Sequence, residues 1–340
     1  MTTIAPHAPI IRRWLTVCAA LVALMVLIGG LTRLTESGLS IVEWKLFSGI
    51  LPPMSHEAWE VEFAAYKTSP EYLKVNKGFS PGDFQRIFWL EYIHRVLGRV
   101  IGLALILPFI YFVARRQLSK PLIKRMAFAC VLVAAQGTVG WIMVASGLVE
   151  QPRVEPLKLA LHLSLALTLF AVLLWTRWQV ATHRPTYASQ GRVGLHLLAL
   201  AVAIQIVLGA LVAGLDAGYS YNSFPLMDGA LIPEGLHHLQ PWWLNHVESI
   251  LTVQFQHRIG AYAVVVLASL CVACLWRQAV PAQRTWLAAL AGGVFLQFAL
   301  GVATLLSVMN IALASLHQMG AVLLLGITLR LIWLFPSNNR

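Results

Sequence analysis

The stretch FWLEYIHRVLGRVIG, residues Phe88–Gly102, places ionisable side chains in a segment that is otherwise apolar enough for a membrane helix. His94 is followed directly by Arg95, and Glu91 lies three residues before His94, on the same face of a helix. Ionisable side chains are costly in lipid and usually have a function there. This stretch is therefore the first candidate for a functional site.

A second stretch, VQFQHRIGAYAVV (Val253–Val265), repeats the arrangement with His257 and Arg258. It has Gln254 at the position that corresponds to Glu91. A carboxylate titrates and an amide does not, so the two copies differ in one chemically important group.

The composition is that of an all-α polytopic membrane protein. The chain has 340 residues, of which 58% are hydrophobic and 11% are charged, and its mean hydropathy is +0.72. A segment of about 20 apolar residues is long enough to cross a bilayer. Eight such segments are predicted: Trp14–Leu34, Phe88–Ala114, Met126–Leu148, Leu157–Trp175, Val193–Leu215, Ser249–Trp276, Trp286–Met309 and Ile311–Phe335.

The net charge of +11 is sorted by side of the membrane, which is not the pattern of a nucleic-acid-binding patch. Arginine and lysine gather at one set of helix ends, for example Arg115, Arg116 and Lys120, and the positive-inside rule makes these ends cytoplasmic. Both termini are then cytoplasmic. The first segment lacks a small-residue cleavage site, and no Arg- and Ser-rich transit segment precedes it. We therefore expect the chain to lie in a bacterial plasma (inner) membrane.

The four cysteines all lie within predicted helices, so we expect no disulfide in an outer loop. They are Cys18, Cys130, Cys271 and Cys274. The last two form a C-x-x-C, which on a membrane helix without a second cysteine pair is more typical of packing than of metal or redox chemistry.

The sequence contains an internal repeat. Gly29–Pro53 aligns without gaps to Gly209–Pro233, and Gln136–Gly140 corresponds to Gln297–Gly301. Each copy includes four predicted helices, and an even number returns the chain to the side where it started. The two halves must therefore share one orientation, related by an axis along the membrane normal.

The predicted organisation is two pseudo-symmetric four-helix bundles. The first half is residues 1–176, with a long outer loop at 35–87, and the second half is residues 193–340. A cytoplasmic linker, residues 177–192, joins them. The loop of the second half, Asp216–Glu248, is shorter, and we expect both loops to cap the outer ends of the bundles.

Four histidines occupy matched positions near the start of the second, fourth, sixth and eighth helices: His94, His162, His257 and His317. These helices run inward, so all four imidazoles lie near the outer leaflet. Two histidines from facing helices can hold one haem. The alternative for each is a hydrogen bond to a neighbouring helix. Zinc or copper would need further Cys, Met or carboxylate ligands, which these positions lack.

The neighbours of the histidines indicate which half reacts. Arg95 and Arg258 are natural partners for haem propionates, although an arginine here can also extend its charge to the membrane interface. Glu91 can move a proton or stabilise positive charge, whereas Gln254 cannot titrate. Chemistry is therefore expected in the first half, unless Glu91 is only a solvated carboxylate near a helix start.

From about Trp14 to Phe335 the chain resembles the haem A synthase family of cytochrome oxidase biogenesis. The motifs that carry the resemblance are GGLTRLTESGLS, IFWLEYIHRVLGR, AGLDAG, FQHR and SLHQMG. The resemblance implies oxidation of the C8 methyl of haem O to a formyl group, which gives haem A. It also implies that His94 and His162 hold the substrate haem, that Glu91 is catalytic, and that His257 and His317 hold a haem b. Some members have a cysteine pair in outer loops, and this chain lacks it.

The expected partners are the lipid bilayer, haem O synthase, cytochrome oxidase assembly factors and an electron donor such as a ferredoxin, with a homo-oligomer as a further possibility. No nicotinamide-binding fingerprint is present in the chain. Two other hypotheses remain: a bis-histidine di-haem b electron carrier linked to quinone, and a transporter. The apolar helix centres are unfavourable for a transporter.

Overall fold

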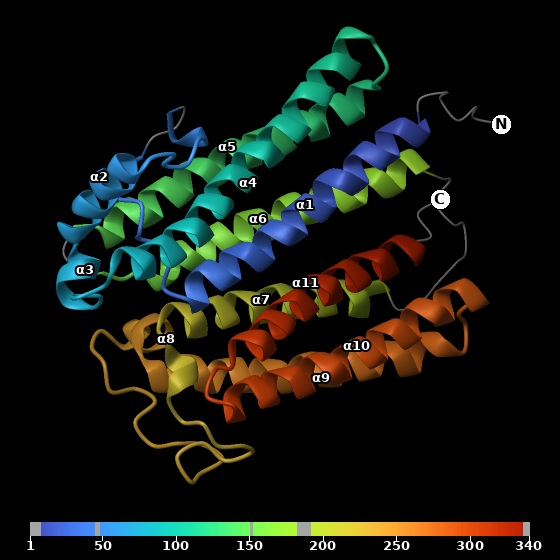
Figure 1. Ribbon diagram of the computed structural model, residues 1–340. Helices are drawn as coiled ribbons and strands as arrows, with labels where there is room; N and C mark the ends of the chain where they lie inside the picture. Colours follow the sequence, from blue (N-terminus) through green and yellow to red (C-terminus); the bar gives the residue numbers. More distant parts are fainter. Residues whose placement is uncertain (1–7, 45–47, 150–151, 182–191, 336–340) are drawn as a thin grey trace. The chain divides into compact units, whose positions relative to one another are not determined.

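The computed structural model describes residues 8–44, 48–149, 152–181 and 192–335, and it is almost wholly helical (Figure 1). Within these ranges eight helices are long and apolar enough to cross a membrane, which confirms the all-α polytopic class. They are α1 (Ala8–Leu34), α4 (Pro81–Ala114), α5 (Lys120–Gly147), α6 (Pro156–Ala181), α7 (Arg192–Gly214), α9 (Ile250–Trp276), α10 (Pro281–Leu306) and α11 (Ile311–Leu334).

Shorter elements connect these helices. They are η1 (Ser48–Ile50), α2 (His56–Lys67), α3 (Pro70–Lys74), η2 (Ala217–Tyr219), η3 (Trp242–Leu244) and α8 (Asn245–Glu248). In the part of the chain that the structure describes there is no strand, only an isolated bridge between Met227 and Ala230.

Several helices begin before their apolar segment begins. Helix α4 starts seven residues before the predicted Phe88, because Ser80 and Asp83 form a capping box. The Asp83 N–H donates to the Ser80 hydroxyl at 3.3 Å, and the Ser80 N–H donates to the Asp83 carboxylate at 3.1 Å. Helix α10 similarly starts at Pro281 rather than at Trp286. Hydropathy marks where the membrane begins, whereas polar caps and proline mark where the helix begins.

Backbone contacts divide the chain into two compact units, each described by itself. The N-terminal unit is Val17–Leu169 and contains most of α1, together with α4, α5 and the first part of α6. Its helices approach closely at glycines; a Cβ at Gly98 would lie 3.5 Å from Met25 Cε, and one at Gly102 would lie 3.8 Å from Val133 Cγ1.

The C-terminal unit comprises Met1–Thr16 and Phe170–Arg340. Within it α7 packs on α9, α9 on α10, α10 on α11 and α11 on α7, so these four helices close a ring (Figure 1). A ring of four helices is the expected bundle for the second half. The division of the chain at residues 176 and 193, and the shared orientation of the two halves, stay predictions.

The predicted outer loop at 35–87 is a folded cap. Helices α2 and α3 lie at the end of the N-terminal unit where α4 begins (Figure 1). A cluster of buried side chains joins them to that end: Ile41, Phe63, Tyr66, Phe84 and Phe88. The rings of Phe63 and Tyr66 each stack on Phe84, with centroids 5.1 Å apart in both pairs. We call this region, α2 and α3 with the cluster beneath them, the cap.

A polar group is buried inside the cap. Tyr66 donates a hydrogen bond to the Glu71 carboxylate at 3.0 Å, and Asn76 donates to the Tyr66 hydroxyl at 2.8 Å. Glu71 is only 5% exposed. Burial raises the pKa of Glu71 to about 7 and also raises the pKa of Tyr66, because it disfavours the charged form of each group.

We expect the cap to be more stable at pH 5.5 than at pH 8. The folded-state pKa of Glu71 lies above its ordinary value of 4.5. Between these two values the folded cap holds a proton that the unfolded chain has released, so stability falls as the pH rises through this range. Hydrogen exchange of α2 and α3, corrected for intrinsic rates, should show this loss.

Glu71→Gln should remove most of this pH dependence, because glutamine keeps the shape of the side chain without titrating. The matched control is Glu57→Gln, since Glu57 is exposed on α2. If the pH dependence is the same in Glu71→Gln as in the unmodified protein, another group is responsible.

Candidate functional site

Each of the four predicted histidines packs its imidazole against a glycine of a neighbouring helix. A Cβ on that glycine would lie about 3 Å from the imidazole Cε1, which is closer than ordinary contact. The pairs and distances are Gly29–His94 at 3.0 Å, Gly140–His162 at 2.9 Å, Gly209–His257 at 3.1 Å and Gly301–His317 at 2.8 Å. The same device therefore occurs four times, and each glycine provides the space in which an imidazole lies.

The structure brings His257 and His317 together, as the sequence predicted. Their ring centroids are 6.4 Å apart, and the ring planes meet at 83°. An imidazole nitrogen binds a metal at about 2 Å, so two imidazoles that share one metal have centroids about 6 Å apart. In the N-terminal unit His94 lies on α4 and His162 on α6. Each pair therefore comes from two helices of one unit.

The nitrogen atoms of the two pairs differ in their partners. Within the described residues Nδ1 of His94 and Nδ1 of His162 are buried without a hydrogen-bond partner. Nδ1 of His257 lies 3.1 Å from Nε2 of Gln205, and Nδ1 of His317 lies 3.2 Å from Nε2 of Gln297. Unpartnered buried nitrogens are uncommon in folded proteins, so the first pair differs from the second in how its rings are held.

These residues fit a haem better than a bare metal ion. Among the residues that the structure describes, no group of three or more His, Cys, Asp or Glu side chains gathers as a metal-ion site would need. A haem supplies four equatorial nitrogens itself and takes only one or two axial ligands from the protein. Two facing imidazoles with a glycine behind each provide that number.

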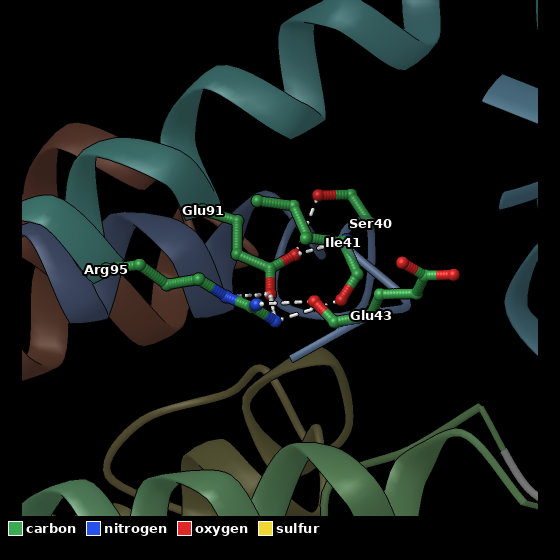
Figure 2. A network of polar contacts seen from close by, with 5 residues as sticks. All are labelled: Ser40, Ile41, Glu43, Glu91 and Arg95. Atoms are coloured by element: carbon green, nitrogen blue, oxygen red, sulfur yellow. Dashed lines mark hydrogen bonds and ion pairs between the residues drawn. The ribbon is translucent and has the colours of Figure 1, made fainter. Parts of the chain in front are cut away.

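Glu91 is buried one turn before His94, with 3% of the residue exposed. Figure 2 shows the network around it. Its Oε2 accepts hydrogen bonds from the Ser40 hydroxyl at 2.7 Å and from the Ile41 N–H at 2.8 Å. Its Oε1 accepts two from Arg95, from Nε at 3.0 Å and from Nη2 at 2.6 Å. Both carboxylate oxygens are therefore held by donors.

Arg95 joins this carboxylate to the segment that follows α1. It also donates to the backbone carbonyls of Ile41 at 2.9 Å and Glu43 at 3.3 Å (Figure 2). Its guanidinium lies 4.9 Å from the ring centroid of Trp44. A buried ion pair is favourable only when further hydrogen bonds satisfy both ions, and these contacts meet that condition.

The second half repeats these arginine contacts at corresponding positions. Arg258 donates to the carbonyls of Tyr221 at 2.7 Å and Ser223 at 2.9 Å. Tyr221 and Ser223 align with Ile41 and Glu43 in the internal repeat. The repeat found in the sequence is thus also a repeat of backbone contacts.

The polarity of the contact beside each arginine is reversed between the halves. Nε2 of Gln254 donates to the carbonyls of Ala217 at 2.8 Å and Ser220 at 2.7 Å. Glu91 instead accepts from the loop, because an ionised carboxylate has no proton to donate. The first loop thus presents hydrogen-bond donors to Glu91, and the second loop presents acceptors to Gln254.

The propionate role of Arg95 and Arg258 stays a prediction. Each guanidinium already donates four hydrogen bonds, to backbone carbonyls of the neighbouring loop and to Glu91 or Gln254 one turn before it. A cavity of about 290 Å³ lies beside the first network and is lined in part by Arg95, Arg99 and Tyr92. Glu43 and Glu62 line it as well, so the cavity carries groups of both charges.

Sequence reasoning missed the glutamines that contact the second pair. Gln205 and Gln297 each lie four residues before the glycine that faces the imidazole. The signal was the recurring Q-x-x-x-G, seen also at Gln136–Gly140, which served only to align the halves. Ser40 was likewise only a repeat marker, although its hydroxyl contacts Glu91.

Eight membrane helices and two facing imidazole pairs are typical of multi-pass membrane proteins that bind haem. Residues 12–329 match the family described as "Cytochrome oxidase assembly protein". The chain belongs to this family.

Relatives named "Heme A synthase" match nearly the whole chain. The one from Bradyrhizobium sp. (strain ORS 278) is 48% identical over 336 residues, which cover 96% of this chain and 91% of the relative. Those from Parvibaculum lavamentivorans and Nitrosospira multiformis are 46% and 43% identical, and cover 92% of this chain and 91% and 89% of the relatives.

We expect Gly140→Ala and Gly301→Ala to lower the haem content of the purified protein several-fold, because the added methyl strikes the imidazole. Gly137→Ala on α5 and Gly292→Ala on α10 are matched controls, since a Cβ at either position meets nothing within 4 Å. All four changes gain about 1 kcal/mol of helix propensity, so helix stability does not separate them. Haem content per protein, measured by absorbance, checks the expectation. An equal loss of haem in the two control variants would contradict it.

Proposed function

We propose that this protein oxidises the C8 methyl of haem O to a formyl group and so produces haem A for terminal oxidases. The observation that carries this proposal is the match to relatives named "Heme A synthase", at 43–48% identity over more than nine-tenths of the chain. The two imidazole pairs support it, because a haem-modifying enzyme has to hold its substrate by axial ligands or by the porphyrin edge.

In this proposal the two pairs have different occupants. His94 and His162 hold the substrate haem in the first half, and His257 and His317 hold a haem b in the second half. The haem b, when bound, supplies a one-electron redox centre. Arg95 and Arg258 contact propionates in addition to the loops that they hold.

The conversion needs oxygen and electrons in fixed amounts. Hydroxylation of the methyl gives a hydroxymethyl group, and a second hydroxylation gives a geminal diol, which loses water to leave the formyl group. With dioxygen as oxidant, each hydroxylation takes two electrons and two protons and releases one water. The electrons come from a partner, and a small iron–sulfur protein such as a ferredoxin is the class that we propose.

Glu91 is the residue that we propose as catalytic. It lies one turn before His94, and the half that holds a permanent haem has an amide at this position. Ser40, Ile41 and Arg95 occupy both of its oxygens. This arrangement favours a fixed negative charge that stabilises positive charge developing on the substrate over a group that exchanges a proton.

The membrane helices and the bacterial relatives support a bacterial plasma membrane location. We propose that both termini are cytoplasmic and that the haem sites lie near the periplasmic side, on the basis of the charge distribution. The proposed partners are haem O synthase, which supplies the substrate, and cytochrome oxidase assembly factors, which receive the product. A homo-oligomer is part of the same proposal.

The function is tested by expressing the protein in a host that makes haem O but no haem A. Pigments extracted from membranes and from purified protein are then identified by mass spectrometry. We expect haem A only where the protein is present, and haem b in the purified protein. A di-haem b electron carrier would instead contain haem b alone, with haem O left unconverted.

Glu91→Gln should lower the haem A yield roughly tenfold or more in this assay, because glutamine keeps the shape but removes the negative charge. Ser40→Ala is the control: it removes one contact between the loop and Glu91 while it leaves the carboxylate in place. Its yield should stay within about twofold of the unmodified protein. Equal losses in the two variants would show that Glu91 acts only by holding the loop.

A further inference from the structure

The second imidazole pair is held by two glutamines in the same way. Nε2 of Gln205 lies 2.8 Å from the backbone carbonyl of His257 and 3.1 Å from its Nδ1. Nε2 of Gln297 lies 2.9 Å from the backbone carbonyl of His317 and 3.2 Å from its Nδ1. Each amide therefore donates a hydrogen bond to the backbone carbonyl of one histidine and lies beside the ring of the same residue.

The carbonyl contacts fix the orientation of each amide. A backbone carbonyl can only accept, so the amide NH₂ group has to face it. Nδ1 of His317 also lies 3.1 Å from the backbone carbonyl of Gln297. A proton on Nδ1 can be donated to that carbonyl, which leaves Nε2 free as the ligating atom. In this tautomer Nδ1 accepts no hydrogen bond, so the amide holds the backbone of the histidine and packs against its ring.

A glycine three residues after each of these histidines makes room for the amide. A Cβ at Gly260 would overlap Oε1 of Gln205, and a Cβ at Gly320 would overlap Oε1 of Gln297. The contact thus needs two sequence elements, Q-x-x-x-G on one helix and H-x-x-G on the next. Both elements occur in both helix pairs of the second half.

The first half lacks this combination. Met25 stands at the position that precedes Gly29 by four residues, and Leu97 follows His94 by three. In the other pair Gln136 is present, but Leu165 follows His162 by three. Within the described residues, Nδ1 of His162 is buried without a hydrogen-bond partner, so Gln136 does not contact it as Gln205 and Gln297 contact their histidines. The missing glycine explains this difference.

We infer that Gln205 and Gln297 are positioning residues that lock His257 and His317 in place as ligands of a retained haem, while His94 and His162 are left unlocked. The inference rests on the proposed function, in which the first half has to release its haem as product and the second half keeps its haem. A ligand whose backbone is hydrogen-bonded and whose ring is packed against the same amide has fewer orientations to lose on binding, so it dissociates less readily.

The test uses the purified, full-length protein with its bound haem. Gln205→Met replaces the glutamine by the residue that occurs at the matching place in the first half. Gly260→Ala should disrupt the same contact in another way, because the added methyl displaces the amide of Gln205 without removing it. The matched control is Gln136→Met, which changes the same residue type at the corresponding place of α5, where it holds no imidazole.

The readouts are carbon monoxide binding to the reduced protein and the midpoint potential of the haem in the second half. A haem with two firmly held histidines has no open position, so the reduced protein should not bind carbon monoxide there. Gln205→Met and Gly260→Ala should both create a fraction that binds it and should shift the potential to a more positive value. Haem content and helicity should be unchanged.

Gln136→Met should leave both readouts as they are in the unmodified protein. The inference is overturned if Gln205→Met and Gly260→Ala also leave both readouts unchanged, or if Gln136→Met changes them equally. The outcome is separate from that of the proposed function. If the protein makes no haem A but Gln205→Met binds carbon monoxide, the proposed function is wrong and the positioning role of Gln205 stands. If the protein makes haem A but Gln205→Met does not bind carbon monoxide, only the positioning role is wrong.

Discussion

The structure depends on the cost of placing an imidazole in the apolar part of a membrane protein. Neutral histidine has one nitrogen that donates and one that accepts, and water is not available there to satisfy either. Each of the four histidines packs closely on a glycine, which leaves the space that the imidazole fills. Under the proposed function, a haem iron is the partner of one nitrogen of each ring.

The two halves share one framework and differ in a few contacts. The arginines bind corresponding backbone carbonyls, so the loop beside each pair has kept its course. The differences are few and local: an acceptor in place of a donor at Glu91 and Gln254, and the absence in the first half of the glutamine contact made by Gln205. Small changes of hydrogen-bond polarity, rather than a change of fold, separate the halves.

Hydropathy and the internal repeat were sufficient to predict the class of fold, since eight apolar segments became eight helices. The helix starts were missed, because Ser80 caps α4 outside its apolar segment. The histidines could be predicted from their matched positions, and the facing of His257 and His317 followed. The loop contacts of Arg95 could not be predicted, because a sequence does not show which backbone carbonyls a side chain will reach. The contact of Gln205 could not be predicted either, because it depends on where α7 packs against Gly260 of α9.

Helix α4 connects the surface of the N-terminal unit to its interior. Its first turns carry Phe84 and Phe88, which belong to the aromatic cluster of the cap, and Glu91 and His94 follow on the same continuous helix. A helix is stiff over this distance, since its backbone hydrogen bonds resist bending. The aromatic cluster of the cap and the imidazole of His94 are therefore positioned by one and the same rigid element.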